Sequence, residues 1–191
     1  MFRRVYFDNS ATTAIDERVL EAMMPYLTDN YGNASSIHFF GQQTRSAVDK
    51  ARHQVAAAVN ARPNEIVFTS GGTESNNLAI RGLVEMLPQP SLATLPERHI
   101  LTSTIEHPAV REVCADLEKR GVAVTYLPVY ENGIVRVDDV RQAIRENTVL
   151  ISVMTANNEI GTLQPVAEIG RLVRGLRDSG RRIWFHTDAV Q

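Results

Sequence analysis

The sequence is poor in cysteine, in long apolar runs and in excess charge of either sign. Cys114 is the only cysteine, which excludes an internal disulfide framework and fits a reducing compartment. No apolar run approaches the ~20 residues that a bilayer-spanning helix needs, and the N-terminal residues lack the apolar stretch of a signal peptide. The formal net charge of −2 provides no basic surface for nucleic acid or for a membrane. We therefore expect a cytoplasmic protein with neither nucleic-acid nor membrane partners.

Lysine is also scarce, because Lys50 and Lys119 are the only lysines and the remaining basic side chains are arginines. The five histidines show neither an HxxxH nor a Cys/His spacing, so no metal site is expected. The chain of 191 residues, with 43% apolar and 22% charged residues, is long enough and apolar enough for one sizeable α/β domain.

The apolar pattern alternates between helical and strand-like segments. Helical spacing predicts a helix from about Asp16 and a longer one through Val48 to Val59. Further helices are expected at 73–87, 108–120, 138–146 and 165–179, where Pro108 and Pro165 suit first-turn positions. Short apolar runs predict five strands, at 65–69, 99–103, 122–127, 148–154 and 182–186. The proline-rich segment 87–97 is expected to be a surface loop. This alternation predicts an α/β fold with a mostly parallel sheet and helices on both faces.

Polar side chains follow four of the predicted strands. Ligand sites in open α/β sheets form outside the carboxyl ends of the strands, so these residues are candidates for one site. The four segments are Ser70–Asn77, Thr104–His107, Thr155–Glu159 and His186–Gln191. Together they indicate a site for a polar, ring-containing ligand.

The turn Gly71-Gly72-Thr73 is the strongest candidate for a phosphate cradle. Glycines let the backbone approach an anion, and a helix that begins there presents free N–H groups and its positive dipole end. The alternative is a simple strand–helix turn with Thr73 as the N-cap. It is not a P-loop, because no Gly-Lys-Ser/Thr sequence follows.

The other candidates also have structural interpretations. Asp188, expected to be partly buried, could pair with a protonated pyridine nitrogen, with an arginine or with a helix terminus. His107 could stack on a planar cofactor or cap the helix that begins at Pro108. Asn157 and Asn158 could orient a ligand or make a turn. His186 is interpreted as a core histidine bonded to strand neighbours.

Cys114 shares a predicted helical stripe with Val110, Val113 and Leu117. That stripe is expected to be buried, which makes an inert thiol the favoured interpretation.

Taken in order, these segments resemble the cysteine desulfurase family, in the class V aminotransferase group of fold-type I pyridoxal-phosphate (PLP) enzymes. The matching segments span the chain: Phe7–Thr13, Gly32–His38 followed by Gly41, Phe68–Ile80, Glu106–His107, Asn157–Gly161 and His186–Gln191. The order and number of these segments make the resemblance specific.

The resemblance implies a role for each matching site residue. Gly72 and Thr73 are expected to hold the phosphate of pyridoxal 5'-phosphate, and His107 to stack on its ring as a catalytic residue that also moves protons. Asn158 and Gln191 are expected to face the phenolic oxygen of the ring, and Asp188 to keep its nitrogen protonated. Residues 1–15 are expected to belong to a small domain, and 16–191 to the PLP-binding large domain.

The resemblance also implies the reaction and the partners. L-cysteine would give L-alanine, and sulfur would pass through an enzyme persulfide to an acceptor or scaffold protein for iron–sulfur cluster assembly, in a homodimer. Two departures stand out: Ala34 replaces the usual proline, and neither lysine matches the family position that binds PLP covalently. Cys114 likewise does not match the catalytic cysteine.

The 191 residues alone are therefore expected to be inactive. Two alternatives stay open: a selenocysteine lyase-like enzyme, and a non-catalytic fragment or split subunit that needs a C-terminal partner chain.

Overall fold

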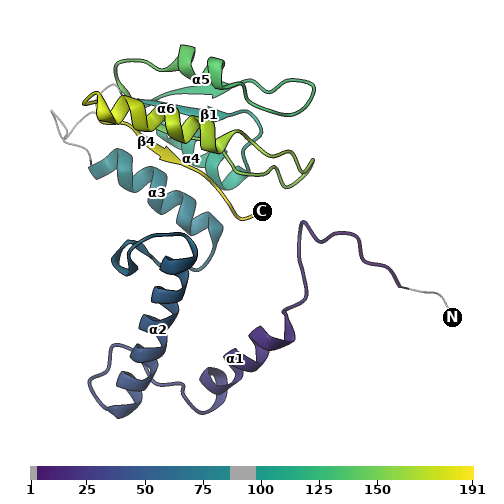
Figure 1. Ribbon diagram of the computed structural model, residues 1–191, viewed down its shortest axis with the longest axis vertical. Helices are drawn as coiled ribbons and strands as arrows, with labels where there is room; N and C mark the ends of the chain where they lie inside the picture. The colour runs from purple at the N-terminus through teal and green to yellow at the C-terminus, as the bar shows by residue number, and fades with distance from the viewer. Residues whose placement is uncertain (1–3, 87–97) are drawn as a thin grey trace. The chain divides into compact units, whose positions relative to one another are not determined.

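A computed structural model describes residues 4–86 and 98–191. The chain divides into a first unit, residues 1–68, and a second unit, residues 69–191 (Figure 1). The division expected between residues 15 and 16 stays a prediction, and the loop expected at 87–97 lies outside the described residues. No helix in the described part of the chain is both long enough and apolar enough to cross a bilayer.

Two helices and one short turn form the first unit. Helix α1 spans Glu17–Thr28, and the side chain of its N-cap, Asp16, accepts a hydrogen bond from the Arg18 N–H. Helix α2 spans Phe39–Ala58, so it begins well before the apolar repeat that predicted it. A 3₁₀ turn, η1, follows at Pro63–Glu65. Both helices expected in this part of the chain are confirmed.

The strand predicted at 65–69 is wrong, because among the described residues this segment has no strand partner. Glu65 closes η1 instead: its carboxylate accepts hydrogen bonds from the backbone N–H of Arg62, at 2.8 Å, and from the Arg62 guanidinium, at 2.6 Å. The Arg52 guanidinium donates to the Ile66 carbonyl and lies 5.0 Å from the centre of the Phe68 ring. The Arg52 side chain thus takes a backbone carbonyl that a sheet would have used.

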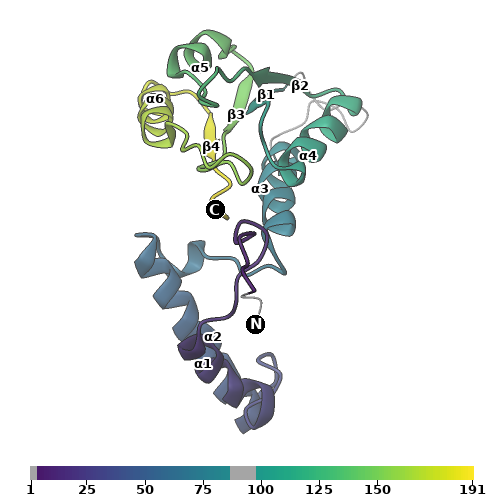
Figure 2. The same cartoon turned by 90° about the vertical axis from the view of Figure 1, so that its right-hand side faces the viewer.

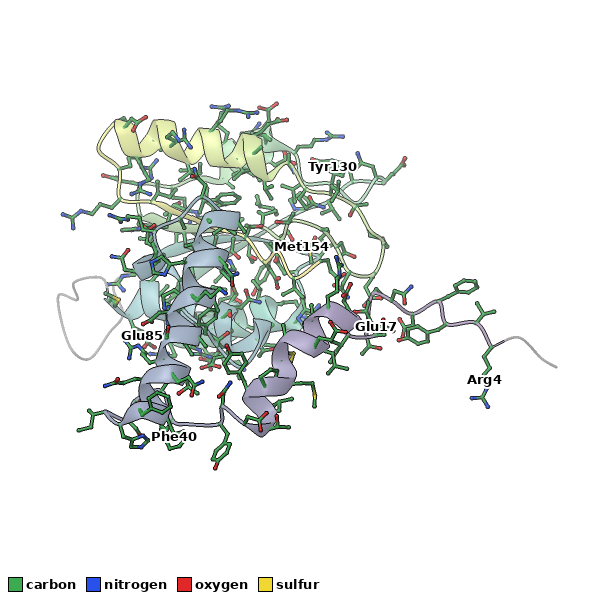
Figure 3. The ribbon with its side chains drawn as sticks, turned by 60° about the horizontal axis from the view of Figure 1, so that its bottom comes forward. Arg4, Glu17, Phe40, Glu85, Tyr130 and Met154 are labelled. Carbon is green, nitrogen blue, oxygen red and sulfur yellow. The ribbon has the colours of Figure 1, made fainter. Side chains whose placement is uncertain are left out.

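Apolar side chains of the first unit remain on its surface. Val19, Met23 and Leu27 on α1 are exposed, as are Phe39 and Phe40 at the start of α2, and Figure 3 shows the side chain of Phe40 there. The groove between α1 and α2 measures about 1000 Å³. An apolar surface of this extent is typical of one that packs against other protein.

The second unit alternates helices with parallel strands. The sheet order is β2-β1-β3-β4, and every neighbouring pair is parallel. Its elements are α3 Gly72–Met86, β1 His99–Ser103, α4 Pro108–Lys119, β2 Ala123–Leu127, α5 Val137–Ala143, β3 Thr148–Ser152, α6 Val166–Asp178 and β4 Trp184–His186. Four of the five predicted strands and all four helices expected here are confirmed. Pro108 occupies the first turn of α4 as expected, whereas Pro165 is the N-cap of α6.

Helices cover both faces of this sheet. Ile100 and Leu150 pack with α3 and α4 in one buried cluster. The next residues along the same strands, Leu101 and Ile151, pack with α5 and α6 in a second cluster. Figure 2 shows the strands between these two helix pairs. Because successive strand residues point to opposite faces, β1 and β3 bury side chains on both faces of the sheet, which confirms the predicted α/β class.

Candidate functional site

The carboxyl ends of β1, β3 and β4 bring the predicted polar segments to one edge of the sheet. The backbone N–H of Val153 donates to the carbonyl of His186, at 3.1 Å, and that of Thr155 donates to the carbonyl of Asp188, at 2.8 Å. The hydroxyls of Thr155 and Thr187 lie 2.9 Å apart. The segments after β3 and β4 therefore run side by side beyond the sheet, as parallel strands require.

Helix α3 begins at this edge, at Gly72. Thr73 therefore lies in the first helical turn, so its interpretation as the N-cap is wrong. A Cβ atom at Gly72 would stand 2.9 Å from Cγ2 of Val190, whereas one at Gly71 would meet nothing within 4 Å. The segment after β4 thus passes against the start of α3, and open space lies beside Gly71. Free N–H groups in the first turn of a helix favour an anion in such a place.

Asp188 is half-buried and held by amide groups. Its Oδ2 accepts a hydrogen bond from Nδ2 of Asn76 on α3, at 2.8 Å, and its Oδ1 accepts from the N–H of Val190, at 3.1 Å. None of the ion pairs found between described residues includes Asp188. The arginine partner considered from the sequence is therefore not found, and the carboxylate keeps capacity for a cationic donor.

His107 and Asn158 border a cavity of about 470 Å³ at the same edge. Nδ1 of His107 accepts a hydrogen bond from the N–H of Ala109, at 3.1 Å, which confirms the helix-capping interpretation. The cap fixes the ring while leaving Nε2 and the ring face for another partner. Asn158 donates to Oε1 of Glu159, at 2.9 Å.

Asn157 has a structural role instead. Its Nδ2 donates to the Ile105 carbonyl at 3.0 Å, and its Oδ1 accepts from the N–H groups of Glu159 and Ile160. It therefore builds the turn, as the second interpretation of this residue expected.

Glu106 is a residue whose importance the sequence did not reveal. It is only 3% exposed, and burial raises the pKa of its carboxyl from 4.5 to about 7, while hydrogen bonds from Ser103 and Met154 oppose that shift. The one signal in the sequence is an acidic residue three positions after a strand without polar alternation. That signal does not distinguish a buried carboxylate from an exposed one at a loop.

His186 and Cys114 conform to their structural interpretations. Nδ1 of His186 lies 2.8 Å from the hydroxyl of Ser152 on the neighbouring strand, and burial lowers its pKa, an effect that Asp188 opposes. Cys114 is fully buried in the core, and burial, reinforced by Glu106 and Glu118, raises the pKa of its thiol to about 12. A thiol with that pKa is unreactive near neutral pH.

The segments of this edge match a known family. The family described as "Aminotransferase class-V" matches residues 5–191, almost the whole chain. The chain belongs to the class-V aminotransferase family. The resemblance drawn from the motifs is confirmed by this match.

Two similar proteins within the comparison are named as cysteine desulfurases. Cysteine desulfurase IscS of Dictyoglomus turgidum is 49% identical over 191 residues, which are 100% of this chain and 46% of that protein. A protein of Drosophila melanogaster named "Cysteine desulfurase, mitochondrial" is 48% identical over 190 residues, covering 99% of this chain and 39% of that protein. The chain thus spans about half the length of the curated relatives it matches.

Solved structures agree with this comparison. A NifS-like protein superposes with a TM-score of 0.90 at 40% identity, covering 99% of this chain and 50% of the other. A structure titled "SspA in complex with cysteine" gives a TM-score of 0.86 at 41% identity, covering 97% of this chain and 50% of the other.

Proposed function

We propose that this chain is the amino-terminal half of a PLP-dependent cysteine desulfurase and that it builds the ring and phosphate side of the cofactor site. The observation that carries the proposal is the contact between Asp188 and Asn76, which joins the end of β4 to α3. It brings a half-buried carboxylate and a glycine-flanked helix start to one edge of the sheet. The relatives named cysteine desulfurase support the assignment of the reaction.

The residues at this edge fit a ligand with an anionic end and a ring that can carry a proton. Space is open beside Gly71, and a Cβ at Gly72 would close part of it. Asp188 is bonded to neutral amides, so a protonated ring nitrogen could add the positive charge that it lacks. His107 presents a ring already fixed by its cap.

In this proposal each residue at the edge has a defined role toward the cofactor. The first-turn N–H groups at Gly72 and Thr73 bind phosphate, Asp188 holds a proton on the ring nitrogen, and His107 packs its ring on the cofactor and moves protons. Asn158 and Gln191 face the phenolic oxygen. PLP, when bound, supplies an electron sink for the substrate carbon.

The substrate and partners belong to the same proposal. L-cysteine is supported by the relative whose structure is titled as a complex with cysteine. Sulfur transfer to an acceptor protein and assembly as a homodimer complete it. The cytoplasmic location stays a prediction, since one relative carries the word mitochondrial in its name.

We also propose that the 191 residues alone do not convert L-cysteine. Lys119 is the last residue of α4, at the opposite end of that helix from His107, and Lys50 lies within α2 of the first unit. The only thiol, Cys114, is fully buried. Purified chain incubated with PLP and L-cysteine should release no alanine by amino-acid analysis, and alanine formation would refute this part of the proposal.

The cofactor site is tested by binding. Pyridoxine 5'-phosphate carries the ring and the phosphate but no aldehyde, so it cannot react with the two lysines. Fluorescence of Trp184 on β4, the only tryptophan, should report saturable binding to the 191-residue chain.

Two matched variants locate the ligand. Asp188→Asn should weaken binding about tenfold by removing the charge, since one such loss is worth ~1.4 kcal/mol. Asp178→Asn, at the exposed end of α6, should bind as the original chain does. Equal affinities for all three proteins, or no saturation at all, would contradict the proposed site.

A further inference from the structure

Glu106 joins the loop after β1 to the loop after β3. Its Oε1 accepts a hydrogen bond from the hydroxyl of Ser103, at 2.6 Å, and from the backbone N–H of Met154, at 2.9 Å. Its Oε2 is buried without a hydrogen-bond partner. Met154 lies among the packed side chains beside the sheet (Figure 3). One oxygen of this carboxyl group thus holds two strand ends together while the other is left buried and unpaired.

A second bond strengthens the same junction and extends it toward Asp188. Nδ2 of Asn157 donates to the carbonyl of Ile105, at 3.0 Å, so two side chains tie the loop of His107 to the loop after β3. Thr155, between those two anchor points, donates its N–H to the carbonyl of Asp188, at 2.8 Å. The placement of His107 relative to Asp188 therefore depends on the contacts of Glu106.

The surroundings of Glu106 favour its neutral form. Asp188, from the segment after β4, and the thiol of Cys114, from α4, are the titratable groups whose charge is coupled to it, and neither is a cation. No ion pair between described residues includes Glu106. Both donors reach Oε1 and none reaches Oε2, so a proton on Oε2 displaces no hydrogen bond. Ionisation would leave a buried negative charge with no cation beside it.

We propose that Glu106 is a positioning residue of the cofactor site and that its protonated form holds the His107 loop in register with the segment that carries Asp188. This inference rests on the proposed function for its cofactor, although the loop contact itself does not. Loss of the proton loosens the junction, and the site then binds the cofactor ring less well.

The first test needs no ligand. In the 191-residue chain, the chemical shift of the Met154 amide should titrate with a midpoint near the pKa of about 7 that burial gives Glu106. Glu106→Gln keeps an acceptor for Ser103 and Met154 but cannot ionise, so its Met154 amide should not titrate and should stay protected from hydrogen exchange.

Two further variants complete this test. Glu106→Ala should speed exchange of the Met154 amide by about tenfold or more, because the acceptor is gone. Glu112→Gln, at an exposed position on α4, should behave as the original chain does. A Met154 midpoint in the ordinary glutamate range, or unchanged exchange in Glu106→Ala, would overturn the inference.

The second test separates the inference from the proposed function. At each pH, the affinity of Glu106→Gln for pyridoxine 5'-phosphate is divided by the affinity of the original chain. The ionisation of the ligand affects both proteins equally and therefore cancels in this ratio. This ratio should rise about tenfold between about pH 6 and pH 8, as expected when only the protonated form binds. A constant ratio with tight binding overturns the inference alone. Absence of binding by both proteins overturns the proposed cofactor site, while the Met154 titration still decides whether Glu106 holds the two loops.

Discussion

A buried ionisable side chain lies near each end of the central strand β1, and the two side chains differ in how fully they are hydrogen-bonded. At the amino end of β1, His99 is fully buried, and both ring nitrogens have partners: Nδ1 lies 2.8 Å from the Thr148 hydroxyl and Nε2 lies 2.8 Å from the Thr125 hydroxyl. Just beyond the carboxyl end, Glu106 is equally inaccessible, yet one of its oxygens has no partner. The His99 ring is thus fully hydrogen-bonded, whereas the Glu106 carboxyl group retains an unsatisfied oxygen.

The contacts around each residue extend this difference. The hydroxyl of Thr148 also accepts the N–H of Arg145, at 2.7 Å, and the Arg145 guanidinium donates to Thr125, at 3.1 Å. Burial, with a smaller contribution from Arg145, lowers the pKa of His99 from 6.5 to about 4, so the ring stays neutral. Fully satisfied polar networks rigidify a fold, whereas partly satisfied ones mark places where chemistry or binding is retained. The contrast agrees with a structural role for His99 and with the ligand site that we propose at the carboxyl end.

The largest expected effect is the loss of the closed network. His99→Ala removes both ring hydrogen bonds, leaves two threonine hydroxyls with fewer partners and opens a cavity. We expect the free energy of unfolding to fall by about 3–5 kcal/mol, measured by urea denaturation.

The exposed residue His53 on α2 supplies the control, because His53→Ala should change the free energy of unfolding by less than about 0.5 kcal/mol. A loss below about 1 kcal/mol for His99→Ala would mean that the amino end is not held by this network.

The second-largest expected effect is a pH dependence of the free energy of unfolding, which arises from Glu106 near the carboxyl end of β1. The pKa of Glu106 rises from 4.5 to about 7 on folding, so the unfolded chain releases this proton at lower pH than the folded chain. The stability from Glu106 is therefore complete below about pH 4.5 and is lost as the pH rises to about 7, a total of about 3 kcal/mol. His99 acts in the opposite direction, because its lowered pKa removes stability as the pH falls from about 6.5 to 4.

Comparison of Glu106→Gln with the original chain isolates the Glu106 contribution. The free energy of unfolding is measured for both proteins by urea denaturation at about pH 5 and about pH 8. The difference between the two proteins should change by about 2.5 kcal/mol in favour of the variant. The exposed Glu112→Gln should show the pH profile of the original chain. If the free energy of unfolding varied with pH in the same way for Glu106→Gln and the original chain, the contrast drawn between Glu106 and His99 would be refuted.

The fold was predictable where local pattern decides it. The apolar run 99–103 became β1 with all five residues buried, because a strand covered on both faces has no polar alternation. The run 65–69 carries a similar signal, yet Arg52 binds the Ile66 carbonyl that a sheet would have needed. A partner from another element is not visible in a local window, so this prediction was wrong.

The sequence was sufficient to predict that the site lies at one edge of the sheet, but not to predict its individual contacts. Parallel strands end at one edge of a sheet, which is why Asp188 and His107 could be grouped from the sequence. Gly72 was grouped with them through the strand predicted at 65–69, which the structure does not form. The bond between Asn76 and Asp188 links residues 112 positions apart, and the burial of Glu106 depends on packing between two loops. Neither has a local signature, so only the assembled sheet reveals them.

The smallest expected effect tests how closely the carboxyl end is packed. Gly72→Ala places a Cβ 2.9 Å from Cγ2 of Val190, whereas Gly71→Ala places one in open space. Val190 is 71% exposed and can move, so overpacking at Gly72 should lower the free energy of unfolding by only about 1 kcal/mol relative to Gly71→Ala. Repeating both substitutions with Val190→Ala should abolish the difference, since the contact is then gone. A difference that survives Val190→Ala would show that the backbone at Gly72, and not its contact with Val190, limits the space there. The carboxyl end of the sheet would then be packed more tightly than the unpaired Oε2 of Glu106 suggests.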